Sequence, residues 1–146
     1  MAQQEKQVTS SDLIYKLAQA GHMIDHELDA ALEAHGLSVA KLGVLRHLAE
    51  AEGPITLGQL AERLACVKSN VTQLIDRLEA EGLAKRVPDQ EDRRSVRAVI
   101  TDKGRQSYEA GRKAQLAAEG KLLQALSSEE QGRLATLLEH FAGGRQ

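Results

Sequence analysis

Aromatic residues are scarce in this 146-residue sequence: Phe, Tyr and Trp make up 2% of it, and Trp is absent. A hydrophobic core must therefore be built from Leu, Val, Ile and Ala. The single cysteine excludes an internal disulfide and fits a reducing compartment. No apolar run approaches the ~20 residues of a membrane-spanning helix, and the N-terminus lacks the apolar stretch of a secretory signal. These absences predict a cytoplasmic protein without a membrane partner.

The sequence also lacks the patterns of an enzyme. It has no Gly-rich phosphate loop, and its one cysteine has no obvious His or Asn partner in the sequence. His22 and His26 stand four residues apart, a spacing that can hold Zn²⁺, but a solvated helix face is the favoured explanation of the pair. We therefore predict no catalytic residues, no cofactor and no metal site.

What is present is helical periodicity. The length fits one domain, and 42% hydrophobic with 27% charged residues is ordinary for a globular protein. Apolar residues recur at helical spacing over about 11–35, and Gly36 follows as a left-handed stop. Ser38 is a cap for a second helix, which Gly53 and Pro54 end.

Residues 56–82 predict a helix-turn-helix. Thr56 and Gln59 form a capping box at the start of a short third helix. After a tight turn, a fourth helix runs over about 68–81, and Gly82 stops it. Two short helices joined by such a turn are typical of a helix-turn-helix.

The stretch "RVPDQEDRRSVRAVIT", residues 86–101, predicts the only β-structure. Pro88 and the polar residues after it forbid a helix, and the short apolar runs on both sides read as two strands of a hairpin. The tip of this hairpin ends in Asp92-Arg93-Arg94. A helix-turn-helix followed by a two-stranded hairpin is a winged helix, whose hairpin is called the wing.

The fourth helix has a buried and a polar face. Its apolar residues lie at i, i+3, i+4 and i+7: Val71, Leu74, Ile75 and Leu78. The opposite direction belongs to Ser69, Gln73, Asp76 and Ala80, with Asn70 and Arg77 on one flank and Thr72 on the other. Short polar side chains of this kind can read base edges in a major groove, although a solvated face has the same appearance.

The charges favour the same region. The whole chain carries a net charge of −2, yet residues 68–105 hold nine Lys/Arg and seven Asp/Glu, a net of +2. Affinity for DNA depends on the surface that meets phosphate and not on the whole-chain charge. An arginine at the wing tip suits the narrow minor groove, and we expect the Asp92 carboxylate to orient a neighbouring arginine as an ion pair.

Two further helices close the chain. Thr101 caps one over about 102–126, and Ser127 with Glu130 forms a capping box for the last. The first, fifth and sixth helices carry more apolar surface than a small winged helix can cover, which favours a twofold homodimer. The predicted fold is mainly α with a small β-hairpin wing: a winged helix-turn-helix (about 38–101) flanked by dimerisation helices (about 11–35 and 102–142) in one domain, 1–146.

From about residue 13 to 141 the chain resembles the MarR/SlyA family of transcriptional regulators. The resemblance rests on "GLSVAKLGVLRHLAE", "ITLGQLAERLACVKSNVTQLIDRLEAEGLAKR" and "DQEDRRSVRAVITDKGR". The last is the most specific, because the family wing carries Asp-x-Arg, here Asp92 and Arg94, before a strand that ends in Ile100-Thr101. The sequence departs from the family at Val67, where a residue able to cap the fourth helix is common.

The resemblance implies a cytoplasmic homodimer that binds a pseudo-palindromic double-stranded DNA operator. It also implies repression that ends when a small-molecule effector or an oxidant binds. The expected DNA-binding residues are Lys68, Ser69, Asn70, Thr72, Gln73, Arg77, Asp92, Arg93 and Arg94.

Two alternatives stay open. A winged helix can bind protein instead of DNA, although such a module has no need of two arginines at its wing tip. Alternatively, the chain is a redox- or metal-sensing regulator of the same family. Cys66 precedes the fourth helix, where a thiolate is favoured; a buried packing role is the simpler interpretation.

Overall fold

The computed structural model describes residues 7–64 and 68–144. The described part contains six helices and three short strands. In chain order they are α1 (Ser10–Glu33), α2 (Val39–Glu50), β1 (Ile55–Thr56), α3 (Leu57–Leu64), α4 (Lys68–Ala80), β2 (Ala84–Pro88), β3 (Val96–Ile100), α5 (Asp102–Leu123) and α6 (Ser128–Gly143). The predicted fold, mainly α with a small β wing, is confirmed.

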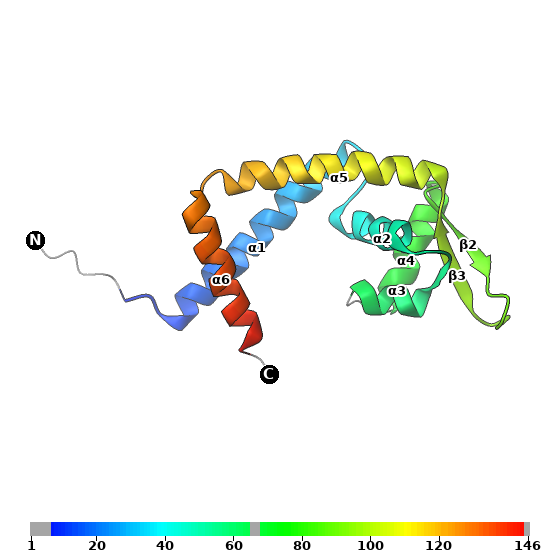
Figure 1. The fold of residues 1–146 in the computed structure, drawn as a ribbon, viewed down its shortest axis with the longest axis horizontal. Coiled ribbons are helices and arrows are strands. Elements are labelled where there is room, and N and C mark those ends of the chain that lie inside the picture. The colour runs from blue at the N-terminus through cyan, green and yellow to red at the C-terminus, as the bar shows by residue number, and fades with distance from the viewer. Residues whose placement is uncertain (1–6, 65–67, 145–146) are drawn as a thin grey trace, which may run out of the picture.

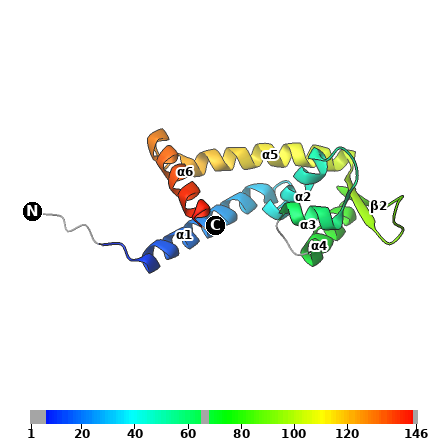
Figure 2. The same cartoon turned by 60° about the horizontal axis from the view of Figure 1, so that its bottom comes forward.

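The elements form a compact end and an extended end (Figure 1). Helices α2, α3 and α4 gather with the strands at the compact end. Helix α5 runs along the length of the molecule, α1 lies beside its middle part, and α6 turns away from its far end (Figure 2). In the described ranges, no helix is both long enough and apolar enough to cross a membrane.

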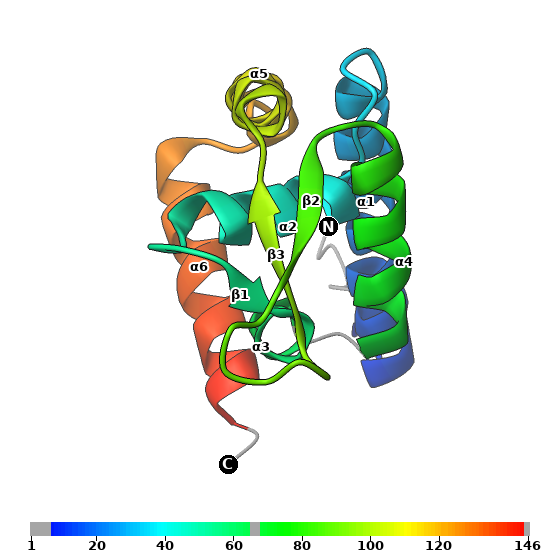
Figure 3. The same cartoon turned by 90° about the vertical axis from the view of Figure 1, so that its right-hand side faces the viewer.

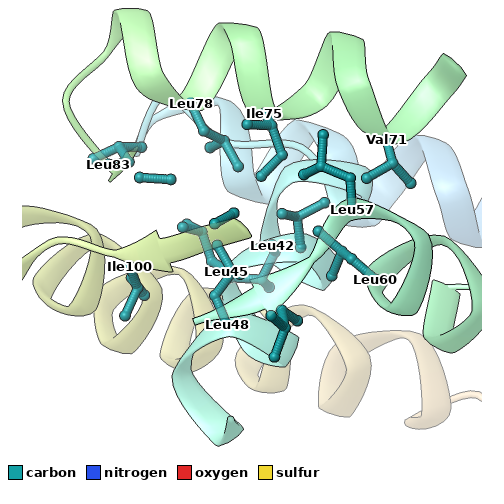
Figure 4. Close-up of a cluster of buried hydrophobic side chains, with 14 of the residues drawn as sticks. Leu42, Leu45, Leu48, Leu57, Leu60, Val71, Ile75, Leu78, Leu83 and Ile100 are labelled. Carbon is teal, nitrogen blue, oxygen red and sulfur yellow. The ribbon is translucent and has the colours of Figure 1, made fainter. Parts of the chain in front are cut away.

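The core sits in the compact end and is aliphatic (Figure 4). Its largest fully buried side chains come from α1, α2, α3 and α4: Leu32, Leu45, Leu60, Ile75, Leu78, Val44 and Val71. The sheet adds Ala98 and Ile100. Burial of one such aliphatic side chain contributes about 1.5–3 kcal/mol, so this cluster accounts for most of the driving force that holds α4 in place.

Side-chain caps begin the helices where the sequence predicts them. Ser38 caps α2, Thr101 caps α5, and both the Thr56–Gln59 and Ser127–Glu130 capping boxes are formed. Each cap satisfies backbone N–H groups that have no partner within the helix and contributes about 1 kcal/mol. One more box, between Thr9 and Asp12, starts α1 slightly earlier than expected.

The sheet has three strands and not the predicted two. The short β1 pairs with β3 in antiparallel register, Ile55 opposite Ala98, so that the strand order is β1-β3-β2. The expected hairpin is formed by β2 and β3, which pair along their full length, from Ala84 opposite Ile100 to Pro88 opposite Val96. Because β3 is the central strand, the base of the wing is fixed on both sides.

Glycine ends two helices as predicted. Gly36 and Gly82 have φ of 68° and 76°, a left-handed conformation that glycine adopts without a steric penalty. The turn at Gly82 leads directly from α4 into β2, so the orientation of the wing depends on the end of α4.

Apolar side chains remain exposed at the extended end. Within the described residues, every exposed large hydrophobic except Val96 lies on α1, α5 or α6 or just before α1. They are Val8, Leu13, Ile14, Tyr15, Met23, Ile24, Leu116, Leu123, Leu134, Leu137, Leu138 and Phe141. No residue of α6 is buried.

Candidate nucleic-acid interface

Helix α4 presents the two faces expected from its periodicity. Val71, Ile75 and Leu78 are fully buried and Leu74 is half-buried, which confirms the inward stripe. The stripe packs against α2, α3 and β2, so the rotation of α4 about its axis is set by the core. A change in that rotation would move fully buried side chains into water.

The outward face of α4 is polar. Asn70, Gln73, Asp76 and Arg77 are exposed, and Thr72 is half-buried. Lys68 and Ser69 belong to the first turn of the helix, but their side chains lie outside the described residues. The face therefore offers amide and guanidinium donors in a row along one side of the helix, which are groups able to hydrogen-bond base edges.

The wing tip and the start of α4 lie on one side of the molecule (Figure 3). Helix α4 ends at the turn into β2, and the hairpin then runs back to place its tip near the level of the N-terminal end of α4. Arg93 and Arg94 at that tip are exposed. The start of α4 and the tip of the wing, which carry predicted contact residues, thus lie on the same side of the molecule.

The expected role of Asp92 is wrong in one respect. Its carboxylate accepts a hydrogen bond from the backbone N–H of Arg94 at 3.0 Å, and its carbonyl accepts one from the N–H of Ser95 at 3.0 Å. Among the described residues it forms no ion pair with an arginine. A carboxylate that bonds the chain two residues on makes a tight Asx turn, so Asp92 shapes the tip through the backbone.

A second carboxylate, which sequence reasoning missed, holds the start of the tip loop of the wing. Asp89 Oδ2 lies 3.2 Å from Arg97 Nε, and its Oδ1 accepts a hydrogen bond from the N–H of Glu91 at 3.1 Å. Arg97 also donates to the Pro54 carbonyl at 3.1 Å. The Glu91 N–H and, less strongly, Arg97 lower the pKa of Asp89 below its ordinary value.

Arg86 of β2 joins the wing to α4 and was also missed. Its guanidinium donates to Asp76 and, at 3.0 Å, to Glu79, while its backbone N–H donates to Glu79 at 2.7 Å. Partial burial lowers the pKa of Arg86, but the hydrogen bonds and charges of the two carboxylates outweigh it and raise the pKa above its ordinary value. The two partners stand seven and ten residues before Arg86, and no sequence motif marks them.

Ion pairs and hydrogen bonds also fix α2 between its neighbours. Asp29 of α1 accepts the N–H of Val39 at 2.7 Å, and Lys41 of α2 pairs with Glu81 at 2.6 Å, just after α4. The C-terminal end of α4 is therefore connected through α2 to α1.

These features are matched by known proteins. The MarR family pattern matches residues 35–95, which hold α2, α3, α4, β2 and the wing tip. YkoM of Bacillus subtilis, an uncharacterized HTH-type transcriptional regulator, is 36% identical over 105 residues, which cover 72% of this chain and 68% of that protein. The chain belongs to the MarR family.

Further MarR-family comparisons extend over most of the chain. The HTH-type transcriptional repressor MdtR of Bacillus subtilis is 33% identical over 135 residues, 90% of this chain and 84% of that protein. A mutant MarR from E. coli, complexed with operator DNA, has the same fold, with a TM-score of 0.79 over 88% of this chain and 92% of that one at 24% identity. As a MarR-family member, the chain is a DNA-binding transcriptional regulator and not an enzyme.

The sensing residues considered from sequence gain no support from the geometry. Cys66 and Val67 lie outside the described residues. His22 and His26 lie on α1, and nowhere in ranges 7–64 and 68–144 do three His, Cys, Asp or Glu side chains gather in a way that could hold a metal ion.

Proposed function

We propose that this MarR-family chain is a repressor that binds a pseudo-palindromic operator as a homodimer. One observation carries the proposal: the N-terminal end of α4 and the wing tip lie on the same side of the compact end (Figure 3), and both carry exposed polar or basic residues. A duplex laid against that side meets the helix in its major groove and the wing in the adjacent groove.

Side-chain chemistry decides which residues of α4 we assign to base edges and which to flanking bases and phosphates. Gln73 and Arg77 are long enough to reach base edges from an exposed helix face, and amide and guanidinium groups are the usual readers of adenine and guanine. Asn70 and Thr72, with Lys68 and Ser69 in the first turn, are assigned to flanking bases and phosphates. One relative supports repression: MdtR, which aligns over 90% of this chain, is named a repressor.

The wing is assigned to the minor groove. The Arg94 guanidinium is exposed, and the Asx turn at Asp92 holds the backbone of Arg94 in a defined conformation. The narrow minor groove of A·T-rich DNA has an enhanced negative potential, which attracts guanidinium. Arg93, beside it, is assigned to a phosphate. The mutant MarR that was solved with operator DNA shares this fold.

We propose a homodimer because a large apolar surface stays uncovered in the single chain. A folded monomer of this mass exposes about 7,400 Å² by the usual scaling, whereas this chain exposes 11024 Å². The apolar side chains that remain exposed lie on α1, α5 and α6. A second copy of the chain with the same surface covers them by twofold symmetry and places two α4 helices on one duplex.

A small-molecule effector remains part of the proposal. Between α2 and α5 lies an open groove of about 610 Å³. Val39, Leu42 and Leu116 give it apolar walls, and Tyr108 and Arg112 add polar groups. Residues of α2 line the groove, and Lys41 of α2 pairs with Glu81, just after α4. A molecule bound in the groove can therefore shift the position of α4.

Arg94→Ala tests the DNA-binding geometry. The side chain is exposed, so its removal leaves folding and dimerisation unchanged. Fluorescence anisotropy with a duplex selected from a random pool should show weaker binding and a salt dependence flattened by about one unit of slope per wing. Arg46→Ala, which removes an exposed arginine of α2, is the control. Unchanged affinity and slope for Arg94→Ala would remove the wing from the interface.

A further inference from the structure

Helix α4 carries two exposed carboxylates that oppose DNA binding. Asp76 lies on the outward face of α4 one turn after Gln73, and Glu79 follows three residues later. Both are exposed. On a helix that enters a groove lined by phosphates, an uncompensated carboxylate is repelled at short range, and salt screens this repulsion only beyond about 8 Å at physiological ionic strength.

Both carboxylates are bound by one cation from another element. The Arg86 guanidinium uses Nη2 for Asp76 and Nη1 for Glu79, and its side chain is only 26% exposed. A planar guanidinium can hold two carboxylates in fixed directions, which the point charge of a lysine cannot. The backbone N–H of Arg86 adds a third bond to Glu79.

We propose that Arg86 is a positioning residue of the DNA interface: it neutralises Asp76 and Glu79 and holds them toward β2, away from the phosphates. The inference rests on the proposed DNA-binding geometry and adds a residue that does not touch DNA. It assigns the arginines of the wing two separate tasks. Arg94 at the tip meets DNA, and Arg86 at the base prepares the helix that reads it.

Replacing Arg86 by an uncharged residue tests this positioning role. Arg86→Gln removes the cation from both carboxylates of α4 and leaves Glu79 only the backbone N–H of residue 86. We expect at least tenfold weaker binding of the selected duplex at about 10 mM salt, where the Debye length is about 30 Å. The loss should shrink toward threefold as salt is raised, because the penalty is charge repulsion. Arg46→Gln breaks the exposed Arg46–Glu50 pair with the same change in net charge, and serves as the matched control with little effect.

Removal of the carboxylates separates this role from a structural one. Adding Asp76→Asn and Glu79→Gln to Arg86→Gln should restore low-salt binding to within about threefold of wild type, although none of the original ion pairs remains. Asp76→Asn with Glu79→Gln alone, with Arg86 intact, should bind at least as tightly as wild type. This double variant keeps the test valid even if Arg86→Gln folds poorly.

The outcomes distinguish the two proposals. If Arg86→Gln binds like wild type, or loses affinity equally at all salt concentrations without recovery in the triple variant, Arg86 is not a charge-compensating residue and the DNA-binding geometry stands. Weaker binding by the double variant would also overturn the inference. If wild-type protein selects no duplex from the pool, the proposed function fails and the role of Arg86 fails with it.

Discussion

The arginines of the wing differ in what surrounds them. Arg86 and Arg97 are bound by carboxylates of neighbouring elements, whereas Arg93 and Arg94 extend from the tip into solvent. An exposed arginine contributes little to folding, because surface ion pairs are worth about 0–1 kcal/mol. Arg93 and Arg94 are therefore available for DNA, while Arg86 and Arg97 help to hold the wing in its conformation.

Helix and wing side chains should differ in how they affect sequence preference. Gln73→Ala and Arg77→Ala remove groups assigned to base edges, so each should relax preference for the selected duplex over a scrambled one by about 1–3 kcal/mol if the contact is bidentate. Arg94→Ala should weaken binding to both duplexes more evenly, because a groove potential and phosphates attract it. Competition binding with the two duplexes measures this difference. Equal losses on both duplexes for all three variants would refute the assignment.

At the residue scale, sequence reasoning predicted which side chains are exposed and missed the ion pairs between distant residues. Gln73, Arg77, Arg93 and Arg94 are exposed as predicted, because helical periodicity and hairpin tips determine exposure locally. Arg86 was read only as part of a strand, since its carboxylates lie on another element. The prediction of an ion pair between Asp92 and an arginine was wrong, because the carboxylate bonds the backbone N–H of Arg94, two residues on.

Among the elements, α5 approaches the end of α4 so closely that only glycine fits at one position. A Cβ on Gly104 would lie 1.9 Å from the Leu83 carbonyl oxygen and 2.8 Å from Ile100 Cγ1. Gly104→Ala should therefore push α5 off the turn between α4 and β2 and lower the free energy of unfolding by about 1–3 kcal/mol. Denaturant unfolding at fixed protein concentration measures the change.

Gly120→Ala on the same helix is the matched control. A Cβ at Gly120 meets nothing within 4 Å, so alanine should be neutral or stabilise the helix by up to about 1 kcal/mol. Similar destabilisation by both substitutions would show that the contact with Leu83 does not set the cost at Gly104, because a Cβ at Gly120 makes no such contact.

The tip loop of the wing should lose support in acid. The pKa of Asp89 is lowered in the folded protein, chiefly by the Glu91 N–H and also by Arg97, so its carboxylate stabilises the fold above its ordinary pKa of about 3.9. That stabilisation is lost as the pH falls through the lower, folded-state value. The difference in unfolding free energy between wild type and Asp89→Asn should therefore shrink from pH 7 to about pH 3.

The control for the acid experiment is Glu91→Gln. It removes a neighbouring carboxyl group and leaves the backbone N–H that Asp89 accepts. A difference between wild type and Asp89→Asn that stays constant over the whole pH range would mean that the Asp89 carboxylate does not hold the wing.

At the element scale, local signals predicted helices and turns well. Caps at Ser38, Thr56, Thr101 and Ser127 mark the starts of helices because a side-chain oxygen three residues from an N–H is a short-range interaction. Strand β1 was missed because it has two residues, and its pairing partner, Ala98, lies far along the chain. Such pairings depend on the packed fold and leave no periodic pattern.

The whole molecule has a compact, well-buried end and an extended end that lacks a cover. This shape explains why sequence periodicity alone favoured an assembly. Helix α6 is amphipathic, yet none of the residues of α6 is buried within the chain. The dimer also bears on function, since the spacing of two α4 helices sets the spacing of operator half-sites. Anything that alters how α1, α5 and α6 meet their copies should alter DNA binding.

Charged substitutions on α6 test this assembly. Leu137 and Leu138 are 63% and 45% exposed within one chain, and burying a leucine contributes about 1.5–3 kcal/mol. Replacing both with Glu should dissociate the dimer, so that sedimentation gives a species of 15.9 kDa in place of twice that mass. The same variant should lose operator affinity, because a monomer holds only one half-site. Glu139→Lys, an exposed charge change on the same helix, should preserve both properties. A stable wild-type monomer at micromolar concentration would contradict the dimer directly, and the uncovered stripe of α6 would then need another partner.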